Sequence, residues 1–246
     1  MMNQRKIKSP LRYWLYGLIF MGFTSCNVAY LPSMQNVPLI SRTGEMTCSL
    51  SGSKLQGAGA LNQNMSMMVN LQYTALGLSA ANEDENDIGF FNMPVPQWNL
   101  ECAPGLYKSL AENIVFEVYG GAGIGGSNVM RYDPEDRYHC NHYRLFIQPD
   151  FGVKGEKWEM AISTRFIRLQ YFNEKPHGLD TDWLKDHDVF NLDKNAYLFI
   201  EPAATIRYKF NEDITAFAQI IYSEKMNPEP LKRMNSTLIV GFFGRF

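Results

Sequence analysis

The chain has 246 residues, of which 46% are hydrophobic, 20% charged and 13% aromatic. It carries 23 basic and 25 acidic side chains, and its four cysteines are spread along the whole length. This composition is ordinary for a folded domain, and it excludes a disordered tail, a disulfide-dense miniprotein and a bundle of membrane helices.

Residues 1–25 have the three parts of an export signal. Four basic side chains precede an apolar run of eleven residues from Tyr13 to Phe23. Because a permanent membrane helix needs about 20 apolar residues, this shorter run predicts a cleaved signal peptide. The stretch Phe-Thr-Ser-Cys at 23–26 resembles a lipobox, which predicts that Cys26 becomes the lipidated first residue of the mature chain. An ordinary signal with an incidental cysteine is the alternative.

The segment that follows the signal has no regular pattern. Residues 26–44 carry Pro32 and Pro38, several Asn and Ser, and no acidic residue, which predicts a lipidated, extended tether. Folded structure is expected to begin near Glu45. Without the signal the chain has 19 basic and 25 acidic residues, a net charge of −6, and no basic block. That balance argues against nucleic acid as a partner.

From residue 45 onward, apolar and polar side chains alternate with the period of two that is typical of β-strands. Trp158, Met160 and Ile162 share one face, for example, while Glu159 and Arg165 share the other. No sustained helical period follows residue 26, so the chain is predicted to be all-β. The expected strands cover residues 45–51, 55–61, 65–79, 98–110, 113–127, 142–153, 157–171, 195–209, 213–224 and 235–246.

The connections between these strands alternate in length. Tight turns are expected at 62–64, 111–112, 154–156 and 211–212, and long charged connections around 80–97, 128–141, 172–194 and 225–234. Short turns at one end and long loops at the other are typical of bacterial outer-membrane barrels. The sequence therefore predicts a closed, up-and-down antiparallel transmembrane β-barrel over residues 45–246, with about ten strands, or eight if residues 45–61 lie outside it.

The polar faces of the strands carry charges of both signs. We expect a lumen charge network of five acidic and three basic side chains, namely Glu101, Glu117, Asp150, Glu159 and Glu201 with Arg144, Arg165 and Arg207. Paired charges across a narrow lumen predict a plugged interior rather than a pore. In the last strand, Leu238, Val240, Phe242 and the terminal Phe246 share a face, which resembles the assembly signal of outer-membrane proteins.

A soluble, lipid-anchored barrel of the lipocalin kind is the alternative, with its apolar face turned inward around an apolar ligand. Periodicity alone cannot distinguish the inside of a barrel from its outside. The terminal aromatic residue, and the aromatic residues that recur near strand ends, favour the membrane barrel.

Several short stretches resemble the strand motifs of a group of uncharacterised bacterial outer-membrane β-barrel lipoproteins. These are residues 36–39 (Asn-Val-Pro-Leu), Gly44-Glu45, 101–107, 116–125 and 199–203. The resemblance covers most of the mature chain and implies an outer-membrane barrel, but it supplies no known activity or site residues.

Few patterns suggest chemistry. The glycines of 121–126 are similar to a dinucleotide-binding loop, but no helix follows them, which favours a curved strand. Residues 139–142 (His-Cys-Asn-His) and the aspartates of 172–194 lack the spacing of known zinc and calcium sites. His187, with His177 and Ser223, is the basis of a second alternative, an outer-membrane lipid hydrolase, but no triad spacing supports it.

The sequence thus predicts a lipoprotein of the Gram-negative outer membrane, both lipid-anchored and membrane-spanning, with a structural or surface-interaction role. We expect no enzymatic activity, cofactor or metal. The expected partners are outer-membrane lipid, the barrel-assembly and lipoprotein-sorting machineries, and an unidentified molecule at the surface loops.

Overall fold

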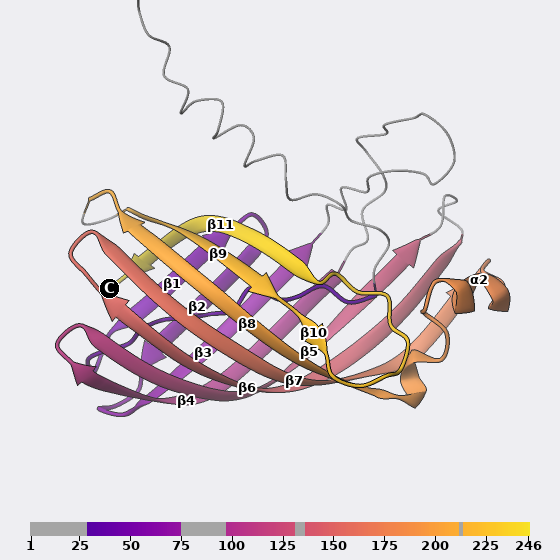
Figure 1. The fold of residues 1–246 in the computed structure, drawn as a ribbon, viewed down its shortest axis with the longest axis horizontal. Helices are drawn as coiled ribbons and strands as arrows, with labels where there is room; N and C mark the ends of the chain where they lie inside the picture. The colour runs from indigo at the N-terminus through magenta and orange to yellow at the C-terminus, as the bar shows by residue number, and fades with distance from the viewer. Residues whose placement is uncertain (1–28, 75–96, 131–135, 212–213) are drawn as a thin grey trace, which may run out of the picture.

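The chain folds into a β-barrel (Figure 1). The computed structural model describes residues 29–74, 97–130, 136–211 and 214–246. Its strands are β1 (Met46–Ser51), β2 (Lys54–Ala60), β3 (Met65–Thr74), β4 (Gln97–Ala111), β5 (Ile114–Met130), β6 (Arg137–Lys154), β7 (Trp158–His177), β8 (Ala196–Lys209), β9 (Thr215–Tyr222), β10 (Glu224–Lys225) and β11 (Ser236–Arg245). Two short helices, α2 (Thr181–Asp186) and η1 (Leu192–Lys194), lie between β7 and β8.

The sheet closes on itself. Each strand from β1 to β8 pairs antiparallel with the strand that follows it. Strand β9 then pairs with β11, and β11 pairs with β1, where Leu50 lies opposite Phe242. The two-residue β10 adds only to the side of β8. The predicted closed antiparallel barrel is therefore confirmed, and it has ten strands in its ring because β1 and β2 belong to it.

The two ends of the barrel differ, and we name them by their connections. Strands β2, β4, β6, β8 and β11 end at the tight-turn end, whereas β3, β5, β7 and β9 end at the long-connection end. The β1–β2 turn at Gly52, which has a positive φ of 56°, also points toward the long-connection end.

Three strands run further than the alternation of apolar residues predicted. The ladder between β5 and β6 continues to the pair Met130 and Arg137, and that between β6 and β7 to Arg137 and His177. The sequence prediction ended these strands where the apolar face ends, but backbone pairing needs no apolar face and so continues beyond it. The expected loop at 128–141 is therefore mostly strand.

The helix α2 was also missed, because its six residues are too few for a visible helical period. The side chain of Asp180 caps it by accepting a hydrogen bond from the backbone N–H of Trp183 at 2.7 Å. Within the described residues, no helix is long and apolar enough to cross a membrane.

Apolar side chains cover the outside of the barrel. Ile162 is 63% exposed and Val240 64%, whereas the inward-facing Glu101 and Arg165 are at most 1% exposed. Leu198 and Ile206, on the same strand as the buried Glu201, point outward as the membrane barrel requires. The lipocalin-like alternative needed the reverse arrangement, so the structure disagrees with it.

The expected tether is not outside the barrel. Residues 32–40 are all buried, and they run as an extended chain through the interior between the two ends (Figure 1). The expectation that folded structure begins near Glu45 is therefore wrong for residues 29–44, which fold with the barrel. We call residues 29–41 the lumen segment.

Gly105 allows an aromatic ring to pack tightly inside the barrel. The Tyr119 ring of β5 lies across Gly105 of β4, so close that a Cβ at Gly105 would overlap the ring. Tyr119 is fully buried, and its hydroxyl accepts a hydrogen bond from Ser66 Oγ at 2.9 Å. The ring therefore has no free space into which to move.

We expect Gly105→Ala to lower the free energy of unfolding by about 1–3 kcal/mol, the usual cost of overpacking a filled interior. Gly120→Ala is the matched control, because a Cβ at Gly120 meets nothing within 4 Å. Urea titration of both variants in detergent micelles measures the effect. Equal stability of the two variants would contradict the packing described here.

Candidate functional site

The lumen, the space enclosed by the ten-stranded ring, is filled by the lumen segment. At the long-connection end, the backbone N–H groups of Ala29 and Tyr30 donate to the carbonyl of Lys232 at 2.9 and 3.3 Å. Tyr30 also forms a parallel bridge with Arg233. At the tight-turn end the chain leaves the lumen and enters β1 beside the C-terminal strand. The segment thus crosses the barrel from one end to the other.

An extended chain inside a barrel has no strand partner, so its backbone groups need side-chain partners. Lumen glutamines supply them. Gln219 accepts from the Gln35 N–H and donates to its carbonyl, both at 2.9 Å, as a neighbouring strand would. Gln148 and Gln56 donate to the carbonyls of Asn36 and Met34, both at 2.7 Å. The lumen therefore recognises the backbone of the segment.

A buried ion triad lies beside the middle of the segment. Glu101 Oε1 is 3.0 Å from Arg144 Nη1, and Glu101 Oε2 is 3.2 Å from Arg165 Nη1. All three side chains are at most 1% exposed. Asn70 donates to Glu101 Oε2 at 2.9 Å, and Arg144 donates to the hydroxyl of Ser33 in the lumen segment. The triad joins the barrel wall to the segment.

A second charged cluster closes the tight-turn end. Glu159 pairs with Arg207 at 3.2 Å and with Arg245 at 2.6 Å, and Glu45 pairs with Arg245 at 2.7 Å and with Lys154 at 3.0 Å. The predicted lumen charge network included Glu159 and Arg207 but not Glu45, Lys154, Arg245 or Lys209, which lies 3.2 Å from Glu159. Arg245 could have been found, because it lies on the face of the last strand opposite Phe242 and Phe246.

The other three predicted carboxylates have no cation within ion-pair distance in the described part of the chain. Glu117 instead accepts the backbone N–H groups of Leu39 and Ile40, each at 2.8 Å. Glu201 accepts the Tyr30 hydroxyl at 2.7 Å, and Asp150 accepts from the Gln148 amide at 3.0 Å. Glu117 and Glu201 therefore hold the lumen segment, which the sequence analysis did not foresee.

Apolar side chains seal the long-connection end. The Tyr30 ring stacks on Phe199 with centroids 4.2 Å apart, and the Tyr171 hydroxyl donates to the Ala29 carbonyl at 2.9 Å. Leu184 of α2, together with Leu192 of η1, is buried in the same cluster. This apolar cluster and the charged cluster therefore lie at opposite ends of the lumen segment.

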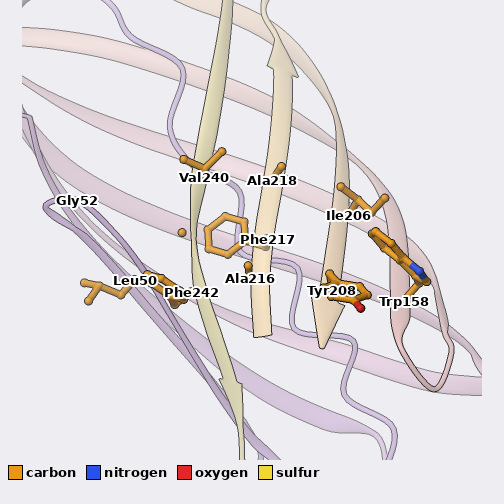
Figure 2. Close-up of a pocket in the computed structure, with 11 residues that line it drawn as sticks. Leu50, Gly52, Trp158, Ile206, Tyr208, Ala216, Phe217, Ala218, Val240 and Phe242 are labelled. Carbon is orange, nitrogen blue, oxygen red and sulfur yellow. The ribbon is translucent and has the colours of Figure 1, made fainter. Parts of the chain in front are cut away.

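The outer wall carries shallow apolar hollows. Figure 2 shows the largest of those described, of about 600 Å³, with side chains from β1, β7, β8, β9 and β11 around it. The small residues Ala216, Ala218 and Gly241 line it, together with the larger Leu50 and Phe242. No charged side chain lines it, so it belongs to the apolar outer surface of the barrel.

The glycine-rich stretch is part of strand β5 and not a phosphate-binding loop. A Cβ at Gly123 would meet Glu101 Cγ at 2.8 Å and Arg144 Cγ at 3.3 Å. A Cβ at Gly121 would likewise overlap Ala103 and Phe146. These glycines make room for the ion triad and its neighbours, in agreement with the expectation of a strand.

The other sequence clusters are dispersed. His139 bonds Asn128 at 2.7 Å on the outer face of β6, while Cys140 and His142 face the interior. Among the described residues, no group of three or more His, Cys, Asp or Glu side chains could hold a metal ion. The His187 ring stacks on Trp183 with centroids 4.0 Å apart, whereas Ser223 is buried in the barrel wall.

Two of the predicted functional positions lie at the chain ends. Cys26 falls outside the described residues, so its lipidation stays a prediction. Phe246 ends the chain at the tight-turn end, where it is 77% exposed and exchanges two backbone hydrogen bonds with Met46, at 2.9 and 3.0 Å. Its role in assembly also stays a prediction.

Comparison with known proteins adds little to this geometry. No family model matches the chain, and no curated protein does. One solved structure that is similar is a loop L8 deletion mutant of OmpT, an outer membrane protein of Vibrio cholerae, at 6% identity and a TM-score of 0.27. The match covers 82% of this chain and 96% of that one. A similarity this weak supports no conclusion about this chain, so the fold assignment rests on the closed ring of strands.

We expect Glu101→Gln to lower the free energy of unfolding by about 3–5 kcal/mol, because it leaves two buried arginines without their shared carboxylate. Asp182→Asn is the control, since Asp182 and Lys185 form an exposed pair 4.0 Å apart. Denaturant titration of both variants in micelles measures the difference. A loss for Glu101→Gln no larger than that of the control would show that the triad does not stabilise the barrel.

Glu45 lies outside the strands, and the stability that it contributes is expected to depend on pH. Burial alone would raise the pKa of its carboxyl, but the Ser41 N–H, Lys154 and Arg245 outweigh burial and hold the pKa below its ordinary value of 4.5. Its contribution to stability is therefore complete above pH 4.5 and is lost as the pH falls through the lowered pKa. We expect Glu45→Gln to be less stable than the native chain at pH 7, and the difference to shrink with acidification below pH 4.5. A difference independent of pH would contradict this assignment.

Proposed function

We propose that this chain is an outer-membrane β-barrel lipoprotein that acts structurally or through the connections at one end, and not as a channel. One observation carries the proposal: large apolar side chains cover the outside of a closed ring, while charged and amide side chains fill its inside. Exposed apolar patches of more than a few hundred Å² are rare in soluble monomers. A bilayer is the solvent that suits this surface.

The filled lumen supports a role other than transport. A conducting barrel keeps a water-filled channel, whereas here the lumen segment occupies the interior and its backbone is bonded to the wall. Without the segment, Glu117 and Glu201 would lose the groups that donate hydrogen bonds to them. Arg144 of the ion triad would lose its hydrogen bond to Ser33. The lumen segment is therefore an integral plug.

The long-connection end offers the surface for contact with other molecules. Helix α2, whose Leu184 belongs to the apolar cluster, stands at this end together with the exposed Phe190 and Met226. Short turns face the periplasm and long loops face outward in outer-membrane barrels, so this end is proposed to face the cell exterior. The proposed partners are outer-membrane lipid, the barrel-assembly and lipoprotein-sorting machineries, and a molecule bound by this end. The absence of catalytic activity remains an expectation.

The test is to export the mature chain from residue 27 without Cys26, behind an ordinary cleavable signal. We expect it to fractionate with the outer membrane, to need detergent for extraction, and to migrate faster on gels before heating than after, because the barrel itself holds it in the bilayer. Release in soluble form without detergent would overturn the membrane assignment.

The same purified chain tests the plug in planar bilayers. We expect no conductance steps, because the lumen is filled. Porin-like steps from the folded, heat-modifiable form would refute the proposal of a closed barrel, and a known porin inserted under the same conditions provides the positive control.

A further inference from the structure

The path of the lumen segment determines at which end of the barrel the chain before it emerges. Residue 29 lies at the long-connection end, and residues 42–45 lie at the tight-turn end. When the chain is followed from β1 toward the N-terminus, it enters the lumen at the tight-turn end and leaves the lumen at the long-connection end. The covalent path from residue 28 toward the N-terminus starts at the long-connection end.

The exit point is fixed by bonds from three elements of the barrel. The Ala29 carbonyl accepts from Ser127 Oγ of β5 at 3.3 Å and from the Tyr171 hydroxyl of β7 at 2.9 Å. Its N–H donates to the Lys232 carbonyl in the connection before β11. Tyr30 is 2% exposed, and its N–H and carbonyl bond Lys232 and Met234. The chain cannot leave the lumen elsewhere without breaking these bonds.

Cys26 is only three residues from this point. Three extended residues span about 11 Å at most, whereas the hydrocarbon layer is about 30 Å thick. A lipid attached at Cys26 therefore cannot reach the leaflet at the tight-turn end. The outer wall offers the chain no alternative route, because its surface is apolar and an unpaired backbone in hydrocarbon is costly.

We infer that the lipid on Cys26 sits in the leaflet at the long-connection end, which is the outer, cell-surface leaflet of the outer membrane. The inference rests on the proposed function, since it needs both the lipidation of Cys26 and the outward orientation of the long connections. It goes further in naming the leaflet that holds the anchor and the route, through the protein's own barrel, by which the anchor comes to lie there. The barrel then spans the outer membrane, and the lipid anchor lies in the outer leaflet of that same membrane.

Site-specific labelling of the full chain on intact cells tests this inference. Cys48, Cys102 and Cys140 are free thiols and are replaced by alanine. Single cysteines are then placed at Val28, at Glu229 in the connection before β11, and at Glu156 in the turn after β6, each in its own variant. A membrane-impermeant maleimide is applied before and after permeabilisation of the outer membrane.

We expect Val28→Cys and Glu229→Cys to label to the same extent on intact and permeabilised cells, and Glu156→Cys to label only after permeabilisation. Labelling of Val28→Cys only after permeabilisation, together with Glu156→Cys, would overturn the inference. So would labelling of Glu229→Cys only after permeabilisation, because the long connections would then face the periplasm. Heat-modifiable migration of each variant shows that its barrel is folded.

The parent chain, with Cys26 alone, separates this inference from the proposed lipidation. A lipidated Cys26 sulfur is blocked, so the denatured parent should not react with maleimide. Reaction at Cys26 would refute lipidation and with it the anchor, whereas the labelling of Val28→Cys would still report the side on which the chain emerges. Failure of the threaded path and failure of the lipoprotein proposal thus give different results.

Discussion

Pairing between β1 and β11 is the interaction on which the rest of the structure depends. Without it, two strands would present unpaired N–H and C=O groups at the edges of the sheet, which hydrocarbon does not tolerate. The seam is short, with four paired positions from Thr47 opposite Arg245 to Leu50 opposite Phe242. Met46 and Phe246 extend it by two further backbone bonds. Closure at this seam defines an inside, and only then can the charged faces of the other strands be buried.

Once the inside exists, it has to be filled. The residues on the inner face are mostly polar, and burying them is costly unless each has a partner. The lumen segment supplies hydrogen-bonding groups along its length, and glutamines of the wall, Glu117 and Glu201 pair with them. In the ion triad and in the cluster around Glu159 and Glu45, three further carboxylates are paired with cations. The wall and the segment therefore stabilise each other.

The alternation of apolar and polar residues along each strand made most of the barrel predictable, because a period of two indicates which residues share a face. In β7, Trp158 and Ile162 point outward and Glu159 and Arg165 inward, as expected. The direction of each face was harder to foresee and depended on the aromatic residues at strand ends. In the ladder of β5 to β7 beyond the apolar belt, the apolar residues Val129, Tyr138 and Cys140 are buried on the inner face, so the apolar outer face that marked the other strands is missing there.

The position of the lumen segment inside the barrel could not be predicted from the sequence of the segment itself. Its prolines and its mixture of Asn, Ser and apolar residues have no period, because its contacts are made by side chains far away in sequence: Gln35 meets Gln219, and Leu39 meets Glu117. The inward-facing glutamines Gln56, Gln148 and Gln219 were the available signal. They face the interior from β2, β6 and β9, and an amide side chain both donates and accepts hydrogen bonds, which suits a peptide backbone.

The threaded path has a consequence for the order of assembly. An N-terminus that carries the lipid proposed for Cys26 could not be drawn through a lumen that is already closed and filled by side chains. The segment must therefore be in place while the sheet is still open, and the ring must close around it. We expect the short β1–β11 seam, which joins the first and last strands of the ring, to form last and to enclose the lumen segment.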